Sequence, residues 1–102
     1  MHLTLLYSPF PSEKSAKQAA ARLLSKKLIA CANIFPSSSL YFWKGKLQNE
    51  NEFILLAKTT AAKAKKAESA LLSMHPYETP CILKIKADTN AKYANWVKVQ
   101  TR

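Results

Sequence analysis

The chain has 102 residues, of which 48% are hydrophobic and 22% are charged. This length provides for one hydrophobic core, so we predict a single domain over residues 1–102, and the composition excludes a disordered chain. Sixteen Lys and Arg outnumber six Asp and Glu, which gives a formal net charge of +10. Such a charge attracts anionic partners, but the lysines are dispersed along the chain, and we interpret them as a solvated surface.

Several classes of protein are excluded by this sequence. No apolar run approaches the roughly 20 residues of a membrane span, and no cationic region precedes the first apolar stretch as in a signal peptide. Gly45 is the only glycine, which excludes a glycine-rich phosphate-binding loop. Cys31 and Cys81 form neither a disulfide framework nor a CxxC motif. We therefore expect a cytoplasmic protein with reduced thiols and no membrane partner.

The first part of the chain predicts a strand followed by a helix. Residues 3–7 have the apolar character of a short buried strand. Ser12 is a candidate N-cap, because its hydroxyl can accept a hydrogen bond from a free N–H of the first helical turn. The apolar stripe of this helix consists of Ala16, Ala19, Ala20, Leu23 and Leu24.

A long hairpin is predicted next. We expect a strand over residues 29–35, an interruption at Pro36, and renewed pairing over residues 39–44. Gly45 marks the turn to a return strand over residues 47–59.

The remaining residues predict a second helix, a fourth strand and a short final helix. Thr60 is a candidate N-cap for the second helix, which Pro76 ends. The apolar stripe of that helix consists of Ala64, Ala67, Leu71 and Met74. We expect a strand over residues 79–87, with residues 81–83 buried on both faces. The final helix is predicted to be capped near Thr89. Its apolar side consists of Tyr93, Trp96 and Val97.

This order of elements indicates the fold class. Strand, helix, strand, strand, helix, strand and helix together predict an α+β, ferredoxin-like βαββαβ fold with an extra C-terminal helix, in which right-handed crossovers place helices on one face of an antiparallel sheet. Residues 40–43 and 53–57 are apolar on both faces of that sheet. One set would face water in a monomer, so we infer self-association.

Three segments of the chain are characteristic when they occur together. They read LIACANIFP at residues 28–36, SLYFWKGK at residues 39–46 and HPYETP at residues 75–80. Further matching positions are Glu52, Lys58, Thr59, Tyr93 and Trp96. In these residues and their spacing, nearly the whole chain resembles the CutA divalent-cation tolerance family. The resemblance implies a tight homotrimer similar in shape to the PII signal proteins, tolerance to copper and other divalent cations, and copper binding. It implies no reaction.

The resemblance also implies two metal ligands. Cys31 falls on the family's frequent cysteine and His75 on the histidine before proline and tyrosine, whereas Cys81 falls where many members have glutamate. A thiolate and an imidazole suit copper or zinc, but two ligands make only a weak site. The alternative for His75 is a residue at the end of the helix whose ring bonds a backbone carbonyl.

The remaining candidate residues are polar or aromatic. Glu52, Lys58 and Tyr77 are candidates for a cleft between subunits, although Glu52 and Lys58 could equally form a structural ion pair on one face of their strand. Three aromatic residues are candidates for the trimer interface. They are Tyr41, Trp43 and Trp96.

Two functions compete at this point. The first is a non-enzymatic homotrimer that responds to metal and binds copper or another divalent cation weakly. The second, which rests on shape alone, is a PII-like small-molecule sensor or assembly scaffold with its site at the subunit cleft. A nucleic-acid partner is not expected, because the aromatic RNP1 pattern of an RNA-recognition module does not follow Lys44-Gly45-Lys46. Catalysis is not expected either, because no orienting acid accompanies Cys31 and His75.

Overall fold

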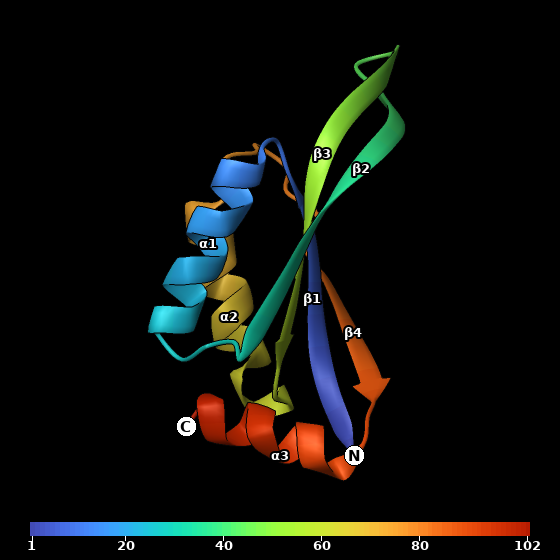
Figure 1. Cartoon of the computed structure of the whole chain (residues 1–102). Coiled ribbons are helices and arrows are strands. Elements are labelled where there is room, and N and C mark those ends of the chain that lie inside the picture. Colours follow the sequence, from blue (N-terminus) through green and yellow to red (C-terminus); the bar gives the residue numbers. More distant parts are fainter.

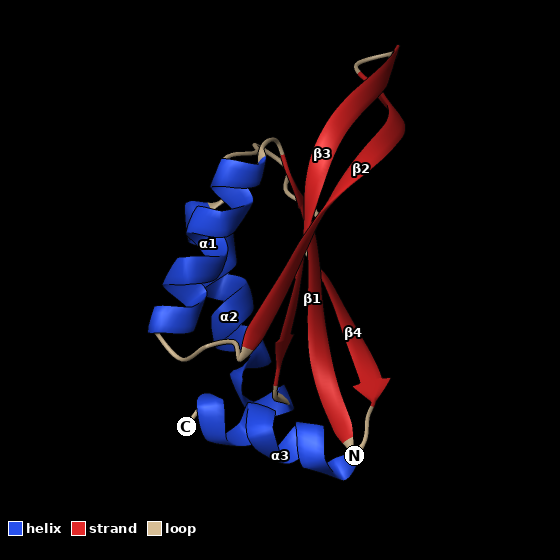
Figure 2. Ribbon diagram, viewed as in Figure 1, coloured by secondary structure: helices blue, strands red, loops and turns tan.

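The computed structural model describes all 102 residues and contains one four-stranded sheet and three helices (Figures 1 and 2). The elements are β1 (His2–Phe10), α1 (Glu13–Ser25), β2 (Cys31–Trp43), β3 (Lys46–Thr59), α2 (Ala61–Met74), β4 (Leu83–Asp88) and α3 (Ala91–Gln100). The strand order is β2-β3-β1-β4, and every neighbouring pair is antiparallel. The predicted α+β class with one antiparallel sheet is therefore confirmed. None of the helices combines the length and the apolar character needed to cross a lipid bilayer.

Helix α1 begins at the residue that its capping chemistry predicts. The Ser12 hydroxyl accepts a hydrogen bond from the Ser15 N–H at 3.0 Å, and the Ser15 hydroxyl accepts one from the Ser12 N–H at 3.3 Å. This reciprocal pair is a capping box, which provides acceptors for two N–H groups that the helix itself cannot bond. Helix α2 starts after Thr60, whose side chain makes no such bond.

The main core lies between the sheet and helices α1 and α2, which cover one face of the sheet (Figure 1). Side chains alternate between the two faces of a strand, so Leu6, Ser8 and Phe10 of β1 all point toward these helices and are buried. The apolar stripe predicted for α1 is confirmed except at Leu24, which is exposed. At about 100° per residue, Leu24 falls at the margin of the stripe.

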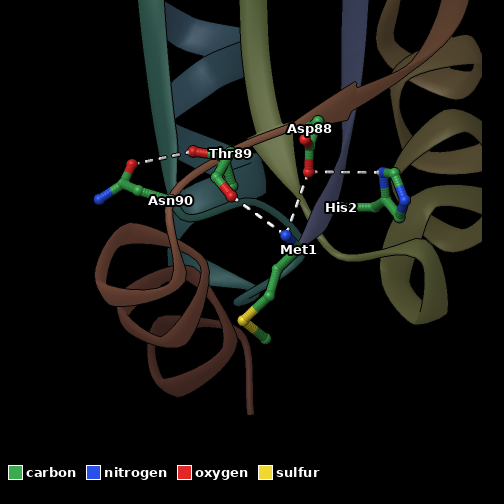
Figure 3. Close-up of polar contacts among 5 residues, drawn as sticks. All are labelled: Met1, His2, Asp88, Thr89 and Asn90. Atoms are coloured by element: carbon green, nitrogen blue, oxygen red, sulfur yellow. Dashed lines mark hydrogen bonds and ion pairs between the residues drawn. The ribbon is translucent and has the colours of Figure 1, made fainter.

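Helix α3 lies across one end of the sheet and packs on the opposite face. The second cluster of buried residues consists of Leu3, Ala30, Ala94 and Val97. Leu3 belongs to the face that α1 and α2 leave open, because it is out of phase with Leu6 and Phe10. Figure 3 shows how the start of β1 is joined to the end of β4: the Met1 ammonium group donates to Asp88 Oδ1 and to the Thr89 carbonyl, each at 3.1 Å.

The predicted cap of α3 needs a correction of one residue. Asn90, and not Thr89, is the N-cap, and neither makes a capping bond to the helix. The Thr89 N–H instead donates to the Met1 carbonyl at 2.7 Å, which keeps Thr89 aligned with the sheet. The apolar side of α3 is as expected in that Val97 is fully buried, while Trp96 remains partly exposed.

The β2–β3 hairpin is longer than its neighbours and extends well beyond the helices (Figure 1). Residues 37–52 pair only with each other, and we call this part of the hairpin the arm. The arm turns through Lys44 and Gly45, whose φ angles of 51° and 77° are both positive. Two positive φ angles are typical of the tight turns whose twist matches that of a hairpin. The doubly apolar character of residues 40–43 is confirmed, since all four side chains are exposed.

The interruption predicted at Pro36 is wrong. Strand β2 runs without a break through Pro36, which pairs with Phe53. Strand β2 is the edge of the sheet, and an edge strand tolerates proline where its nitrogen faces away from the partner strand.

Strand β4 is shorter than the predicted strand over residues 79–87. It begins at Leu83, and both Cys81 and Leu83 are exposed, so the prediction that residues 81–83 are buried on both faces is wrong. β4 is the other edge strand, and nothing within the chain covers its outer side. Before Leu83 the backbone ladder is replaced by a side chain: the Ser8 hydroxyl donates to the Cys81 carbonyl at 2.7 Å.

We expect the Ser12→Ala variant to lose about 1 kcal/mol of unfolding free energy, because it removes the capping acceptor of α1. Urea unfolding followed by circular dichroism measures this loss. Thr60→Ala is the matched control, since Thr60 occupies the same position before α2 without a capping bond. Equal losses in the two variants would contradict the role given to Ser12.

Candidate functional site

A cleft of about 440 Å³ lies between the arm and the chain segment that links α2 to β4. Strands β2 and β3 contribute Tyr41, Trp43, Glu50 and Glu52, and the linking segment contributes residues 77–81 except Pro80. The arm residues share one face because they alternate along their strands and because Ser39 pairs with Glu50. The cleft therefore follows directly from the register of the hairpin.

The opposite face of the arm has a different character. Leu40 and Phe42 are 70% and 73% exposed, and Leu47 is also open to solvent. These side chains are on the same side of the sheet as helices α1 and α2 but lie beyond them (Figure 1). The arm thus presents one apolar face and one face of aromatic and acidic side chains.

Glu52 and Tyr77 are joined at the base of the cleft. The Tyr77 hydroxyl donates to Glu52 Oε2 at 2.6 Å, a short distance typical of a hydrogen bond to a charged acceptor. Glu52 is only 6% exposed. Burial, this hydrogen bond and the charge of Glu52 raise the pKa of the Tyr77 hydroxyl. Partial burial and the carboxylates of Glu50 and Glu52 likewise raise the pKa of Tyr41. Both tyrosines are therefore held in their neutral form.

His75 is bonded through both of its ring nitrogens. Its ring stacks on Phe10 with centroids 4.2 Å apart. Nε2 lies 2.9 Å from the Pro9 carbonyl oxygen, which can only accept, and Nδ1 lies 3.2 Å from the Tyr77 N–H, which can only donate. Only a neutral ring with its proton on Nε2 satisfies both partners. Burial lowers the pKa of His75, opposed by the Pro9 bond and the charge of Glu52.

Cys31 lies elsewhere on the sheet, beside helix α3. It pairs across the strands with Lys58, and the Lys58 Nζ lies 5.7 Å from the centre of the Tyr93 ring. Trp96 stacks on the other aromatic ring of this group, with 5.6 Å between the centroids of Tyr93 and Trp96. Burial and the Cys31 thiol raise the pKa of the Tyr93 hydroxyl. Cys31 is half-buried in this setting.

Within one chain, the two residues that resemble metal ligands do not meet. Cys31 pairs with Lys58, and Lys58 pairs with Leu5 of β1. His75 bonds Pro9, which is four residues further along β1, or roughly 13 Å at about 3.3 Å per residue. No three His, Cys, Asp or Glu side chains lie close enough together to hold a metal ion. A metal at His75 would also have to displace one of its two hydrogen bonds, so these residues do not fit a metal ion within a single chain.

The three residues predicted for a cleft are only partly together. Glu52 and Tyr77 are in contact, but Lys58 lies six residues away along β3, roughly 20 Å at about 3.3 Å per residue. Lys58 and Glu52 form no ion pair. Glu50 and Glu78 also line the cleft and were missed. The period of two in the return strand could have placed Glu50 beside Glu52, whereas Glu78 belongs to an irregular segment that no periodicity describes.

Comparison with known proteins identifies relatives over nearly the whole chain. A sequence model of the family described as CutA1 divalent ion tolerance protein matches residues 4–100. The chain is 40% identical over 97 residues to the divalent-cation tolerance protein CutA of Thermotoga maritima, covering 94% of this chain and 96% of the relative. It is 38% identical over 96 residues to the protein of the same name from Escherichia coli, with 90% and 84% covered.

Solved structures agree closely with this fold. The divalent ion tolerance protein CutA1 from Ehrlichia chaffeensis superposes with a TM-score of 0.95 at 36% identity, covering 98% of this chain and 95% of that one. The protein described as the periplasmic divalent cation tolerance protein CutA from Archaeoglobus fulgidus gives a TM-score of 0.94 at 36% identity, with all of both chains covered.

The geometry of His75 predicts a dependence of stability on pH. Its folded pKa lies below the ordinary value of 6.5, so the unfolded chain binds this proton more readily. Its contribution to stability is complete above pH 6.5 and is lost as the pH falls from there to the folded pKa. Nuclear magnetic resonance of the His2→Gln variant, in which His75 is the only histidine, measures the pKa directly.

The His75→Phe variant serves as the control for this prediction. Phenylalanine retains the stacking on Phe10 but does not titrate, so its urea unfolding should lose less stability as the pH falls than that of the parent protein. A measured pKa for His75 at or above 6.5 would contradict the arrangement of its two hydrogen bonds.

Proposed function

Because the chain belongs to the CutA1 divalent ion tolerance family, we propose that it takes part in the response to divalent cations as a non-enzymatic homotrimer that binds copper or another divalent cation weakly. The observation that carries this proposal is the similarity, over nearly the whole chain, to proteins named for divalent-cation tolerance. None of those names denotes an enzyme. The cytoplasm is the proposed location, since Cys31 and Cys81 are both free thiols, as in a reducing compartment.

The open face of the sheet supports the homotrimer. Phe35, Leu83 and Ile85 lie on the face opposite α1 and α2, and each is more than 40% exposed. Strands β2 and β4 each have one unpaired edge, and such edges bind other strands. When the β2 edge of one copy pairs with the β4 edge of the next, three such contacts close a ring. Tyr41, Trp43 and Trp96 are the proposed aromatic contacts of that interface.

Light scattering should give a particle mass of about three times the 11.4 kDa of one chain. The Trp43→Asp variant should dissociate more readily, because a charge buried in an apolar contact costs several kcal/mol. Leu24→Asp is the matched control: Leu24 is 41% exposed and Trp43 43%, but Leu24 lies on helix α1. A particle of one chain's mass at micromolar concentration would refute the homotrimer, and an unchanged Trp43→Asp trimer would remove Trp43 from the interface.

Metal binding is proposed to be weak and to require more than one subunit. Cys31 and His75 are the proposed ligands, and they are too far apart within one chain to share an ion. Structural zinc sites with four ligands reach roughly 10–16 kcal/mol, and two ligands fall far short of that. The trimer, and not the metal, is proposed to hold the fold.

Isothermal titration with copper and zinc should give dissociation constants that are micromolar or weaker, and Cys31→Ala or His75→Ala should weaken binding further. The titrations are best made in a Cys81→Ala background, since Cys81 is an exposed thiol that binds copper on its own account. The melting temperature should change little on adding EDTA. A large fall with EDTA would reveal a structural metal site, and heats identical to buffer for all variants would exclude metal binding.

A second candidate function is a PII-like small-molecule sensor or assembly scaffold with its site at the subunit cleft. The observation that favours it is the cleft itself, with the buried Glu52 and its partner Tyr77 at the base. Lys58 would belong to such a site only as a contribution from a neighbouring copy. Thermal-shift measurements test this candidate, because a ligand that prefers the folded state raises the melting temperature.

A further inference from the structure

We propose that the cleft between the arm and the segment of residues 77–81 binds the ammonium group of a small organic molecule. The inference rests on the second candidate function, for which it names the class of ligand, and it does not depend on the response to metal ions.

The distribution of acidic side chains is the first observation. Of the six acids in the chain, three are in ion pairs on the outer surface, namely Glu13, Glu68 and Asp88. The other three are Glu50, Glu52 and Glu78. None of them forms an ion pair, although the chain has sixteen Lys and Arg, and all three line this one cleft. A strongly basic protein therefore has a cleft that is lined by acids and by no basic residue.

The burial of Glu52 is the second observation, and it is independent of the first. Glu52 is 94% buried, since only 6% of it is exposed, yet it has a single hydrogen bond, from Tyr77. A buried carboxylate is unfavourable unless a cation or several donors compensate its charge, and an ionised carboxylate can accept about four hydrogen bonds. Its remaining capacity faces the cleft, where a donor with a positive charge would complete it.

The aromatic walls of the cleft are the third observation. Tyr41, Trp43 and Tyr77 line it together with the carboxylates. A cation within about 6 Å of such a ring is attracted by the negative face of the π system. The raised pKa values of Tyr41 and Tyr77 agree with this, because nearby negative charge contributes to both shifts. Rings and carboxylates together form the kind of surface that recognises ammonium groups.

The shape of the cleft favours an organic cation over a metal ion. Its volume of about 440 Å³ lies in the range of small-molecule sites, which span roughly 300–1,000 Å³. The three carboxylates are not close enough together to surround a metal ion. An ammonium group on an aliphatic chain uses both parts of the lining, because its charge meets the acids and its methylene groups meet the rings.

The experiment titrates the complete protein with the diamine putrescine, with succinate as the dicarboxylate of the same chain length. Calorimetry and melting temperature are measured for the parent protein, for Glu50→Gln/Glu78→Gln and for Glu52→Gln. Glu13→Gln is the matched control, because Glu13 pairs with Lys17 on helix α1. Exposed Glu50 and Glu78 can be replaced without disturbing the core, which keeps the test valid if Glu52→Gln fails to fold.

We expect saturable binding of putrescine with a rise in melting temperature, and a loss of affinity of at least about tenfold on removing the carboxylates, since hydrogen bonds to charged groups are worth roughly 1.5–3 kcal/mol. Glu13→Gln should bind as the parent does. Binding of succinate without putrescine would overturn this inference and leave the small-molecule function standing, whereas binding of neither would overturn both. Failure of putrescine together with a less stable trimer in Glu50→Gln/Glu78→Gln would show that a lysine of a second copy occupies the cleft, which also overturns the proposal.

Discussion

The packing of both faces of the sheet is the constraint on which the rest of the molecule depends. In β1, Leu6 and Phe10 point into the core under α1 and α2, whereas Leu3 points to the other face. In β3, Leu55 faces the helices and Ile54, its neighbour, is equally buried on the far side. Because the chain has only α3 to cover that far side, and α3 reaches only one end, most of the face stays open. The apolar sheet face, the unpaired edges and the proposed homotrimer all follow from this shortage of cover.

Periodicity and capping predict the elements of this fold because both act over a few residues. The stripe of α1, the cap at Ser12 and the turn at Gly45 depend on neighbours within one or two turns of chain, and all are found as predicted. Pro36 and residues 79–82 were misjudged for a different reason. Whether proline interrupts a strand, and whether an apolar run is buried, depends on the strand's place at the edge of the sheet, which is a property of the whole topology.

The site was harder to predict than the fold, because it combines an arm with a segment that has no repeat. Glu52 and Tyr77 were expected together and are in contact, 25 residues apart in the chain. Lys58 was grouped with Glu52 through the period of two, which assigns a face but says nothing of distance along the strand. His75 shows a further limit: its type and spacing suit a metal ligand, yet its ring bridges Pro9 and Tyr77 and so fixes the wall of the cleft. Sequence pattern identifies residue types, whereas the use of their lone pairs is decided by tertiary contacts.

The arm makes the newly synthesised chain vulnerable until it meets its partners. Leu40, Phe42 and Leu47 are open to water on a strand pair whose outer edge is free, and such a surface can add strands from any chain nearby. Pro36 within β2 and the lysines at positions 44 and 46 interrupt this surface, because a missing N–H and repelling charges both disfavour strand addition. These three residues therefore influence whether free subunits form an ordered assembly or aggregate, and their effect would be seen in the yield of folded protein at high rates of synthesis.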